Sequence, residues 1–331
     1  MSQSAEECFP KVWVAPGVIH DDGTHYLLRH PSDQQTTRPT VILVHGIGSF
    51  FASFSDVADI LLKEGYSTLQ YDFYGRGFSG PSPSGKYDEH IHIEQLEKLL
   101  AFLRGRGEVT EKVHLVGHSM GGSFVALFTA KHAQTIKSVT FCTPAGLMNS
   151  WALGTLSWCG LIEPLLKPII IGKSQMIRAT HRDFHLSDGI YGQRKEEYLH
   201  QMMLQAEHHP QFFDVMWKCL WEFPLNDITD RVTALSQHAH LRVLVLWAQY
   251  DQMIPMGYNL GRWESILEKG HSQWRSHVVE DAGHMFIVEH FEQVAAEILA
   301  TIRQTDDESI LNPAEPFSVR PVEAVDSSST S

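Results

Sequence analysis

The stretch VHLVGHSMGGSF, residues 113–124, passes from alternating apolar residues through a run of small residues into a second apolar segment. Ser119 stands in the small run, with Gly117 two positions before it and Gly121 two positions after it. A serine that projects from a sharp strand-to-helix turn leaves room only for small residues at those two positions. The helix that follows would place partial positive charge and free N–H groups beside the serine oxygen. The pattern predicts a nucleophilic serine between a strand and a helix.

Strand and helix patterns alternate on both sides of this turn. Residues 40–46 form a continuous apolar run, as expected of a parallel strand that is covered on both faces, and further strands are predicted at 66–72, 112–117, 136–142, 241–247 and 274–280. Helical patterns lie between or after these runs, and a long helical pattern closes the series over residues 284–304. Strands that alternate with helices indicate an α/β fold with a doubly wound, mostly parallel sheet.

The alternation stops between Pro144 and Ser236, a stretch far longer than an ordinary connection. We therefore expect a sheet-based core in two parts, residues 1–143 and 237–303, with a helical cap inserted at 144–236. Residues 304–331 are rich in acidic residues, proline and serine, so a disordered acidic tail is expected there.

The composition narrows the class of protein. The chain has 331 residues, and 26 Lys and Arg against 39 Asp and Glu give a formal charge of -13. That charge argues against nucleic acid as a partner and disfavours an anionic substrate. The start of the chain lacks a leader pattern and no apolar run is long enough to span a membrane, so a cytoplasmic protein is expected. The four cysteines have no metal-site spacing and are expected to be reduced thiols.

A serine needs a base and an acid that orients the base, and in this architecture they follow it in the order acid, then histidine. Asp251 lies in the loop after the strand at 241–247, and His284 lies in the loop after the strand at 274–280. Asp281 is the rival acid, but it lies only three residues before His284, too near for an ordinary loop to turn it toward the imidazole. His118 is expected to point away from Ser119.

An oxyanion needs two N–H donors close to the serine. The first expected donor is the N–H of Met120, the residue after the nucleophile. The second is the N–H of Ile47 in the segment HGIGSFF, with Gly48 as the fallback. Asp72, after the second strand, is expected to stabilise its own turn by accepting local N–H bonds.

These motifs resemble those of serine hydrolases of the α/β-hydrolase superfamily over roughly residues 10–303. The matching segments are HGIG at 45–48, DFYGRGFS at 72–79, GHSMGG at 117–122, YDQMIP at 250–255 and DAGH at 281–284. Within the superfamily the chain is similar to monoacylglycerol lipases and carboxylesterase-like members with a helical cap. The resemblance implies the catalytic triad Ser119, Asp251 and His284, and it implies no cofactor and no metal.

Substrate contacts are harder to predict from the sequence. The cap segment 151–171 concentrates apolar residues, among them Trp158 and Leu161, and Phe50 and Phe51 follow the oxyanion segment. These four residues are expected to bind an acyl chain, and the cap could also contact a membrane surface. The alternative is that the apolar residues of the cap form the cap's own core. In THRDFH, a polar helix face or turn is favoured over a metal pair made by His181 and His185.

The expected function is cleavage of carboxylic esters through an acyl-enzyme on Ser119, with monoacylglycerols or other medium or long acyl esters as substrates. The alternative is hydrolysis of a carbon–carbon bond in meta-cleavage products, or cofactor-free peroxidase chemistry, with the same residues. A binding protein without activity is the third possibility. The sequence leaves the oligomeric state open.

Overall fold

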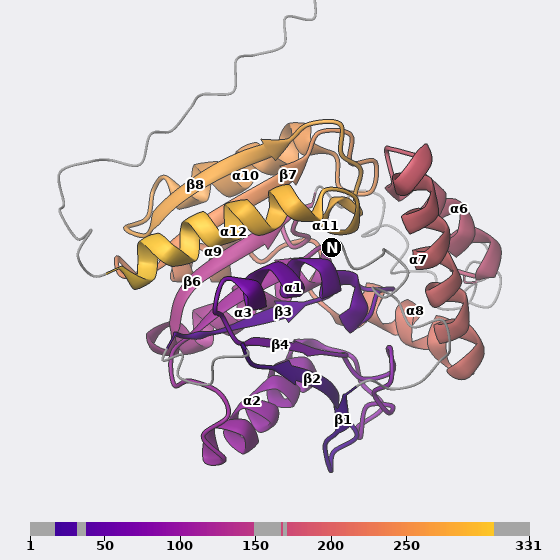
Figure 1. The fold of residues 1–331 in the computed structure, drawn as a ribbon, viewed down its shortest axis with the longest axis horizontal. Coiled ribbons are helices and arrows are strands. Elements are labelled where there is room, and N and C mark those ends of the chain that lie inside the picture. Colours follow the sequence, from indigo (N-terminus) through magenta and orange to yellow (C-terminus); the bar gives the residue numbers. More distant parts are fainter. Residues whose placement is uncertain (1–16, 32–37, 149–166, 168–170, 308–331) are drawn as a thin grey trace, which may run out of the picture.

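The computed structural model describes residues 17–31, 38–148, 167 and 171–307 of the chain. In these residues one eight-stranded sheet has the order β1-β2-β4-β3-β5-β6-β7-β8 (Figure 1). The strands are β1 (Val18–Ile19), β2 (His25–Arg29), β3 (Thr40–Val44), β4 (Thr68–Tyr71), β5 (Val113–His118), β6 (Ile136–Cys142), β7 (Arg242–Ala248) and β8 (Gln273–Val279). β2 is antiparallel to β1 and β4, and the pairings from β4 to β8 are parallel. The predicted mostly parallel sheet is confirmed.

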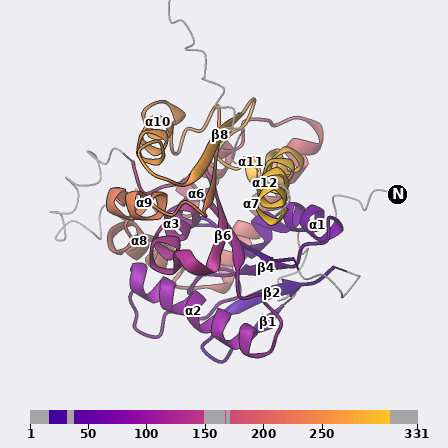
Figure 2. The same ribbon diagram turned by 90° about the vertical axis from the view of Figure 1, so that its left-hand side faces the viewer.

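Helices cover both faces of the sheet (Figure 2). One layer contains α1 (Ser55–Lys63) and α12 (Phe291–Asp306), which pack against each other. The opposite layer contains α2 (Glu89–Gly105), α3 (Met120–His132), α9 (Thr229–Ser236) and α10 (Met256–Leu267). A sheet covered on both faces needs strands that are buried on both sides, and this explains the nearly continuous apolar run of β3 and the burial of almost every residue of β5 and β6.

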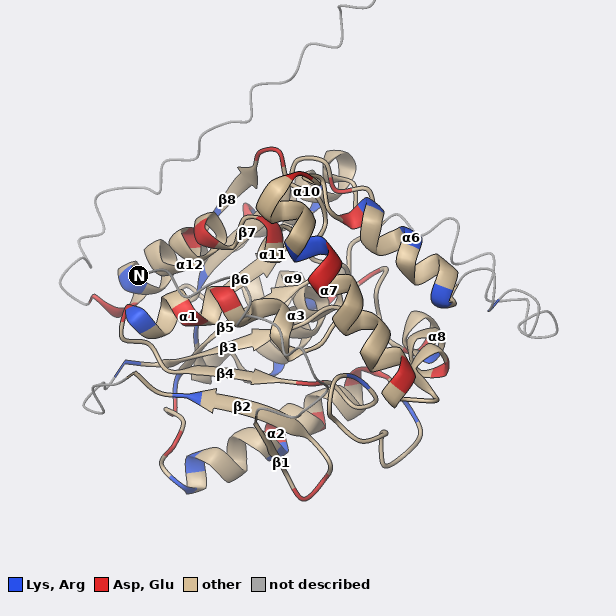
Figure 3. Cartoon of the chain, turned by 45° about the vertical axis from the view of Figure 1, so that its right-hand side comes forward, with Lys and Arg blue, Asp and Glu red and all other residues tan. Residues whose placement is uncertain are grey.

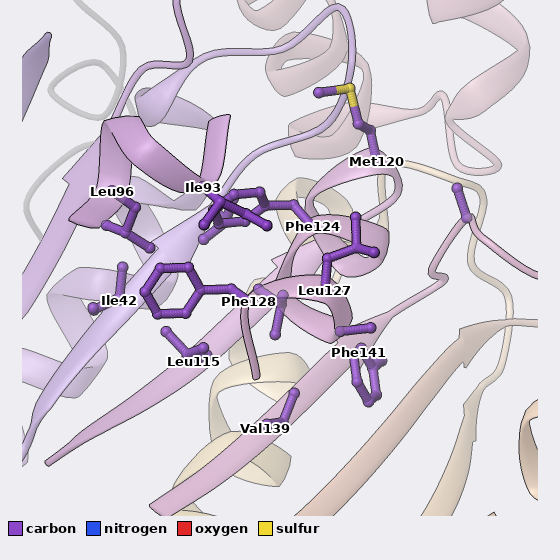
Figure 4. Close-up of a cluster of buried hydrophobic side chains, with 14 of the residues drawn as sticks. Ile42, Ile93, Leu96, Leu115, Met120, Phe124, Leu127, Phe128, Val139 and Phe141 are labelled. Atoms are coloured by element: carbon purple, nitrogen blue, oxygen red, sulfur yellow. The ribbon is translucent and has the colours of Figure 1, made fainter. Parts of the chain in front are cut away.

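The centre of the core lies between α3 and the middle strands (Figure 4). Phe124 and Phe128 of α3 face Leu115 and Val139 of the sheet, and all four side chains are buried. Burying one such side chain contributes roughly 1.5–3 kcal/mol, so this contact fixes α3 firmly on the sheet. The start of α3, where Ser119 stands, is therefore held by the core.

The turn at Ser119 is as tight as the sequence predicts. Ser119 has φ 56°, a conformation that is rare for residues other than glycine. A Cβ atom on Gly117 would lie 2.3 Å from the Gly121 carbonyl oxygen, and a Cβ on Gly121 would lie 2.3 Å from the Val44 carbonyl oxygen. No larger residue fits at either position.

The insertion after β6 is helical in its described part. It contains α6 (Lys173–Asp183), α7 (Gly189–His208) and α8 (Phe212–Glu222), which lie at one end of the sheet (Figure 1). α9, inside the predicted cap boundary, instead packs against α3 and α10 in the core layer. At the other end of the chain, α12 continues to Asp306, beyond the predicted end of the core at 303. The predicted tail from 308 onward lies outside the described residues.

Asp72 holds the turn after β4, as predicted. Its Oδ1 accepts a hydrogen bond from Phe51 N at 2.7 Å, and its Oδ2 accepts one from Phe78 N at 2.9 Å. His25 Nδ1 lies 2.7 Å from the same Oδ2. The carboxyl group is fully buried, so it joins three segments of the core and is out of reach of a substrate.

Candidate active site

The predicted site residues come from four loops at one edge of the sheet. Ser119 follows β5, Asp251 follows β7, His284 follows β8, and Ile47 follows β3. Parallel strands end at the same edge, so residues far apart in the sequence meet there. Ser119, His284 and Ile47 line a single cavity of about 760 Å³, and Asp251 lies behind His284.

Asp251 and His284 form a buried pair. His284 Nδ1 lies 2.6 Å from Asp251 Oδ2, and the Asp251 side chain is fully buried. The other carboxylate oxygen of Asp251 accepts hydrogen bonds from Met253 N at 2.8 Å and Ile254 N at 2.7 Å. These bonds fix the carboxylate, so His284 Nδ1 carries the proton that it donates to Asp251. His284 Nε2 is then left as an acceptor, the form that a general base needs.

The pKa of His284 is shifted upward from its ordinary value of 6.5. Burial alone would lower this pKa because it disfavours the charged ring. The Asp251 carboxylate raises it by its charge and its hydrogen bond, Asp183 raises it further, and Arg182 lowers it. The net direction means that His284 holds a proton more strongly than a free imidazole does.

This shift predicts the pH dependence of the reaction. Only neutral His284 can accept the serine proton, so kcat/KM is expected to rise with pH through a midpoint above 6.5, the ordinary imidazole value. Initial rates at low substrate concentration between pH 5 and 9 measure the midpoint. Asp281→Asn serves as the control, because Asp281 is exposed and lies three residues before His284. This variant is expected to have the same pH midpoint as the wild-type protein. A midpoint below 6.5 would contradict the assignment of His284.

Ser119 sits at the floor of the cavity and is 7% exposed. Main-chain bonds hold it: Ser119 N donates to Cys142 O at 3.0 Å, and Ser119 O accepts from Gly122 N and Ala145 N, each at 3.0 Å. Within the described residues, no hydrogen bond joins Ser119 Oγ to His284. Such bonds are often long in free enzymes and tighten when substrate binds.

The expected oxyanion donors border the same cavity. Ile47 and Met120 both line it, and no protein acceptor for either N–H is found among the residues that the structure describes. His45 Nδ1 donates to Gly46 O at 2.8 Å, while its Nε2 accepts from Phe73 N at 3.1 Å. Burial lowers the pKa of His45 to about 4, so the ring stays neutral. The bond to Gly46 O fixes the peptide group whose N–H belongs to Ile47.

Helices of the insertion hold the loop that carries Ile47. Gln205 of α7 donates from Nε2 to Gly48 O at 3.1 Å and accepts from Gly77 N at 2.6 Å. Tyr198 OH donates to Ser49 Oγ at 3.0 Å. Arg76, fully buried, donates from Nε to Ile47 O at 2.8 Å and from Nη2 to Cys219 Sγ of α8 at 2.9 Å. The loop is therefore positioned by the insertion as well as by the sheet.

Methionine dominates the cavity wall. Seven of the ten methionines of the chain line it: Met120, Met148, Met176, Met202, Met216, Met253 and Met285. Methionine side chains are flexible and polarisable, so such a wall adapts to apolar groups of different shape. The polar side chains of the wall that do not belong to the predicted triad come mainly from α6, which contributes Arg178, Arg182 and Asp183.

Two of the four predicted substrate contacts need correction. Phe50 and Phe51 are 0% and 3% exposed, and neither lines the cavity. Both belong to the hydrophobic cluster that contains α1 and α12, because the short helix at Phe51–Phe54 turns them into the core. Trp158 and Leu161 lie outside the described residues, so their predicted role stays a prediction.

The structure gives His118 a contact that the sequence analysis did not predict. Its ring packs on the ring of His284 with 4.7 Å between centroids, and its Nε2 lies 2.8 Å from the His284 carbonyl oxygen. Burial lowers the pKa of His118, so a neutral ring donates this bond. His118 borders the cavity but is only 1% exposed, so it supports the loop that carries His284. No local sequence pattern indicates this contact.

Two kinds of feature are absent from the described part of the chain. No group of three or more His, Cys, Asp or Glu side chains could hold a metal ion there. Within the same residues, no helix is long and apolar enough to cross a membrane. His181 and His185 do not converge on a common point: His181 faces Glu196, and His185 stacks on Tyr250.

Comparisons with known proteins agree with the observed fold. A family model described as the alpha/beta hydrolase fold matches residues 39–291. The 2-hydroxy-6-oxononadienedioate/2-hydroxy-6-oxononatrienedioate hydrolase of Klebsiella pneumoniae is 25% identical over 289 residues, or 85% of this chain and 93% of that protein. A bromoperoxidase from Bacillus anthracis has a similar structure, with a TM-score of 0.66, 18% identity and coverage of 85% of this chain and 95% of that chain. A thermophilic esterase from Thermogutta terrifontis has a TM-score of 0.65, 21% identity and coverage of 85% and 93%.

Proposed function

Since this chain belongs to the alpha/beta hydrolase fold family, we propose that it is a serine hydrolase in which Ser119 attacks a carbonyl carbon of its substrate. One observation supports the proposal: Ser119, His284, Ile47 and Met120 border one mainly apolar cavity, and Asp251 is hydrogen-bonded to His284. In the proposed site Ser119 is the nucleophile, His284 is the base, and the N–H groups of Ile47 and Met120 are the oxyanion donors.

The proposed reaction has two stages. Ser119 Oγ bonds to the carbonyl carbon while its proton passes to His284 Nε2, and the oxyanion accepts hydrogen bonds from Ile47 N and Met120 N. Collapse breaks the bond to the leaving group, which takes the proton from His284. Water then attacks the acyl-enzyme, gives its proton to His284, and releases the acid as Ser119 recovers its proton.

Cleavage of a carbon–carbon bond next to a ketone is the first candidate. The compound in the name of the Klebsiella relative is a keto diacid without an ester or amide bond, so its hydrolysis breaks a carbon–carbon bond. Two cations at the cavity suit such a diacid: Arg178 and Arg182 both line it, and Figure 3 shows the basic segments of α6 in blue. The net charge of -13 disfavours anionic substrates, but these arginines provide a local exception.

Ester hydrolysis is the second candidate, and the methionine wall favours it. Seven thioether side chains offer an adaptable apolar surface to an acyl chain. Peroxidase chemistry fits less well with the same wall. A peracid formed at Ser119 would arise among these thioethers, which oxidants convert to sulfoxides.

A direct comparison of substrates tests the choice of bond. With 2-hydroxy-6-oxononadienedioate and p-nitrophenyl hexanoate under the same conditions, we expect kcat/KM for the diacid to be at least about tenfold higher, or about 1.4 kcal/mol in transition-state binding. Loss of the dienol absorbance and release of p-nitrophenol measure the two rates. An Arg178→Gln/Arg182→Gln variant is expected to lower the diacid rate more than the ester rate.

Arg106→Gln is the matched control, because Arg106 is exposed and does not line the cavity. If the hexanoate is cleaved faster than the diacid, and if the double arginine variant cleaves it at the wild-type rate, ester hydrolysis becomes the proposed function. No turnover of either compound, together with no labelling of Ser119 by a fluorophosphonate, would overturn the serine hydrolase itself.

A further inference from the structure

Asp183 is a buried carboxyl group that the proposed reaction leaves without a role. It is the last residue of α6, it is 8% exposed, and it lines the cavity together with His284. Its Oδ1 has no hydrogen-bond partner among the residues that the structure describes. Arg182 Nε lies 3.9 Å away, close enough for charge attraction but too far for a hydrogen bond.

Main-chain contacts fix Asp183 beside the histidine loop. Its carbonyl oxygen accepts a hydrogen bond from Met285 N, the residue after His284, at 2.8 Å. The packing is close, because a Cβ on Gly283 would lie 2.4 Å from the same oxygen. In a serine hydrolase the catalytic histidine delivers its proton to the leaving group. A side chain next to the histidine therefore faces the part of the substrate that leaves.

The chemistry of this carboxyl group calls for a donor. An ionised carboxylate only accepts hydrogen bonds, and leaving a buried acceptor unpaired is costly. Burial raises the pKa of Asp183 to about 6, Asp251 also raises it, and His284 and Arg182 lower it, so the ionised form prevails at neutral pH. A cationic donor would meet Arg178, Arg182 and His284 at the same wall. A neutral hydroxyl group avoids that repulsion.

We propose that Asp183 forms a hydroxyl-binding subsite, which accepts a hydrogen bond from a hydroxyl group on the leaving part of the substrate. Oδ1 is enclosed by protein, whereas the side chain as a whole is 12% exposed where it lines the cavity, and within the described residues Oδ2 also has no hydrogen-bond partner. Oδ2 is therefore the acceptor that the subsite offers to a substrate. The proposal rests on the serine hydrolase function and makes Asp183 a determinant of specificity. It fits both candidate substrates, because the dienedioate carries a 2-hydroxyl group and a monoacylglycerol carries glycerol hydroxyls.

Two esters of equal size test the subsite. 2-Hydroxyethyl hexanoate and propyl hexanoate differ only in a hydroxyl group in place of a methyl group. We expect the wild-type protein to favour the hydroxyethyl ester by at least about tenfold in kcat/KM, since a site that binds a hydroxyl discriminates strongly against its absence. Asp183→Leu is expected to bring the ratio near one. Asp183→Asn, which keeps an acceptor oxygen, is expected to retain part of the preference.

Asp188→Leu is the matched control, because Asp188 is exposed at the start of α7 and does not line the cavity. It is expected to leave the ratio unchanged. Fluorophosphonate labelling of Ser119 in each variant reports on the serine hydrolase separately. If Ser119 is labelled while the wild-type ratio is near one, or while Asp183→Leu keeps the full preference, the subsite is overturned and the hydrolase stands.

A binding measurement covers the case in which neither ester is cleaved. Titration calorimetry with 2-(hexyloxy)ethanol and hexyl propyl ether compares a hydroxyl group with a methyl group in ethers that cannot be hydrolysed. Tighter binding of the hydroxy ether by the wild-type protein, lost in Asp183→Leu, supports the subsite. Equal binding of the two ethers by the wild-type protein overturns it, whatever reaction the site performs.

Discussion

Replacement of Ser119 by alanine is expected to lower kcat at least about 10⁴-fold with every substrate that the chain cleaves, because no other group can form the acyl-enzyme. The fold should survive the change. The hydrogen bonds that hold this turn use the main chain of Ser119, and alanine keeps them. Ser119 is only 7% exposed, but the loss of its hydroxyl leaves these main-chain bonds in place. The free energy of unfolding should therefore change by about 0.5 kcal/mol, and the melting temperature should move by only a few degrees. Steady-state kinetics and a thermal melt measure the two effects.

Covalent labelling is the control for this prediction. A fluorophosphonate should attach to the wild-type protein once, at Ser119, and should not attach to the alanine variant. Ser123, on the first turn of α3, is buried and bonded to Pro224 O, so Ser123→Ala should leave labelling intact. Turnover retained by Ser119→Ala would show that another residue is the nucleophile.

Replacement of Asp251 by asparagine is expected to lower kcat about 10⁴-fold. The amide can still accept the bonds from Met253 N and Ile254 N through its oxygen, so the loop should keep its shape. Its NH₂ group would then face His284 Nδ1 and favour the tautomer with the proton on Nε2. In that tautomer the histidine cannot accept the serine proton, so the loss should appear in kcat while the fold remains.

Asp281→Asn is the matched control for this change. Asp281 is exposed, and its main-chain oxygen accepts a hydrogen bond from His290 Nε2 at 3.0 Å. Within the described residues its side chain forms no hydrogen bond with His284. The control should retain nearly full activity. If the Asp251→Asn protein is active and the Asp281→Asn protein is inactive, Asp281 and not Asp251 is the acid that orients His284.

The sequence predicts the parts of this site that depend on local patterns. Ser119, Asp251 and His284 each follow an apolar strand, and parallel strands bring such positions to one edge. The turn at Ser119 was also predictable, since Gly117 and Gly121 leave no room for a Cβ. The boundaries of the core were predicted less accurately. The sequences of α9 and of the end of α12 indicate helices, but they do not show that these helices pack in the core layers.

Contacts between distant segments could not be predicted in this way. His118 and His284 meet although 166 positions separate them. Asp183 likewise bonds to Met285 far along the chain, and the THRDFH pattern indicates only a polar helix face or turn. Phe50 and Phe51 follow the oxyanion segment directly, but the short helix at 51–54 turns them into the core. In each case the three-dimensional packing decides the role, and a single sequence contains no record of it.

Gln205 and Tyr198 of α7 form hydrogen bonds with the loop that carries Ile47. These bonds limit how the cap can be replaced, by engineering or in evolution. A cap that only covers a cavity could be exchanged between relatives as an independent module. Here the cap helix α7 also bonds to the loop that carries Ile47, the proposed oxyanion donor. A chimera that receives a foreign cap without these two side chains is therefore expected to change in substrate range and turnover together. Changes in α7 are therefore expected to affect the chemistry at Ser119 as well as substrate binding. A chimera that keeps its activity should take α7 and the loop at 46–49 from the same parent protein.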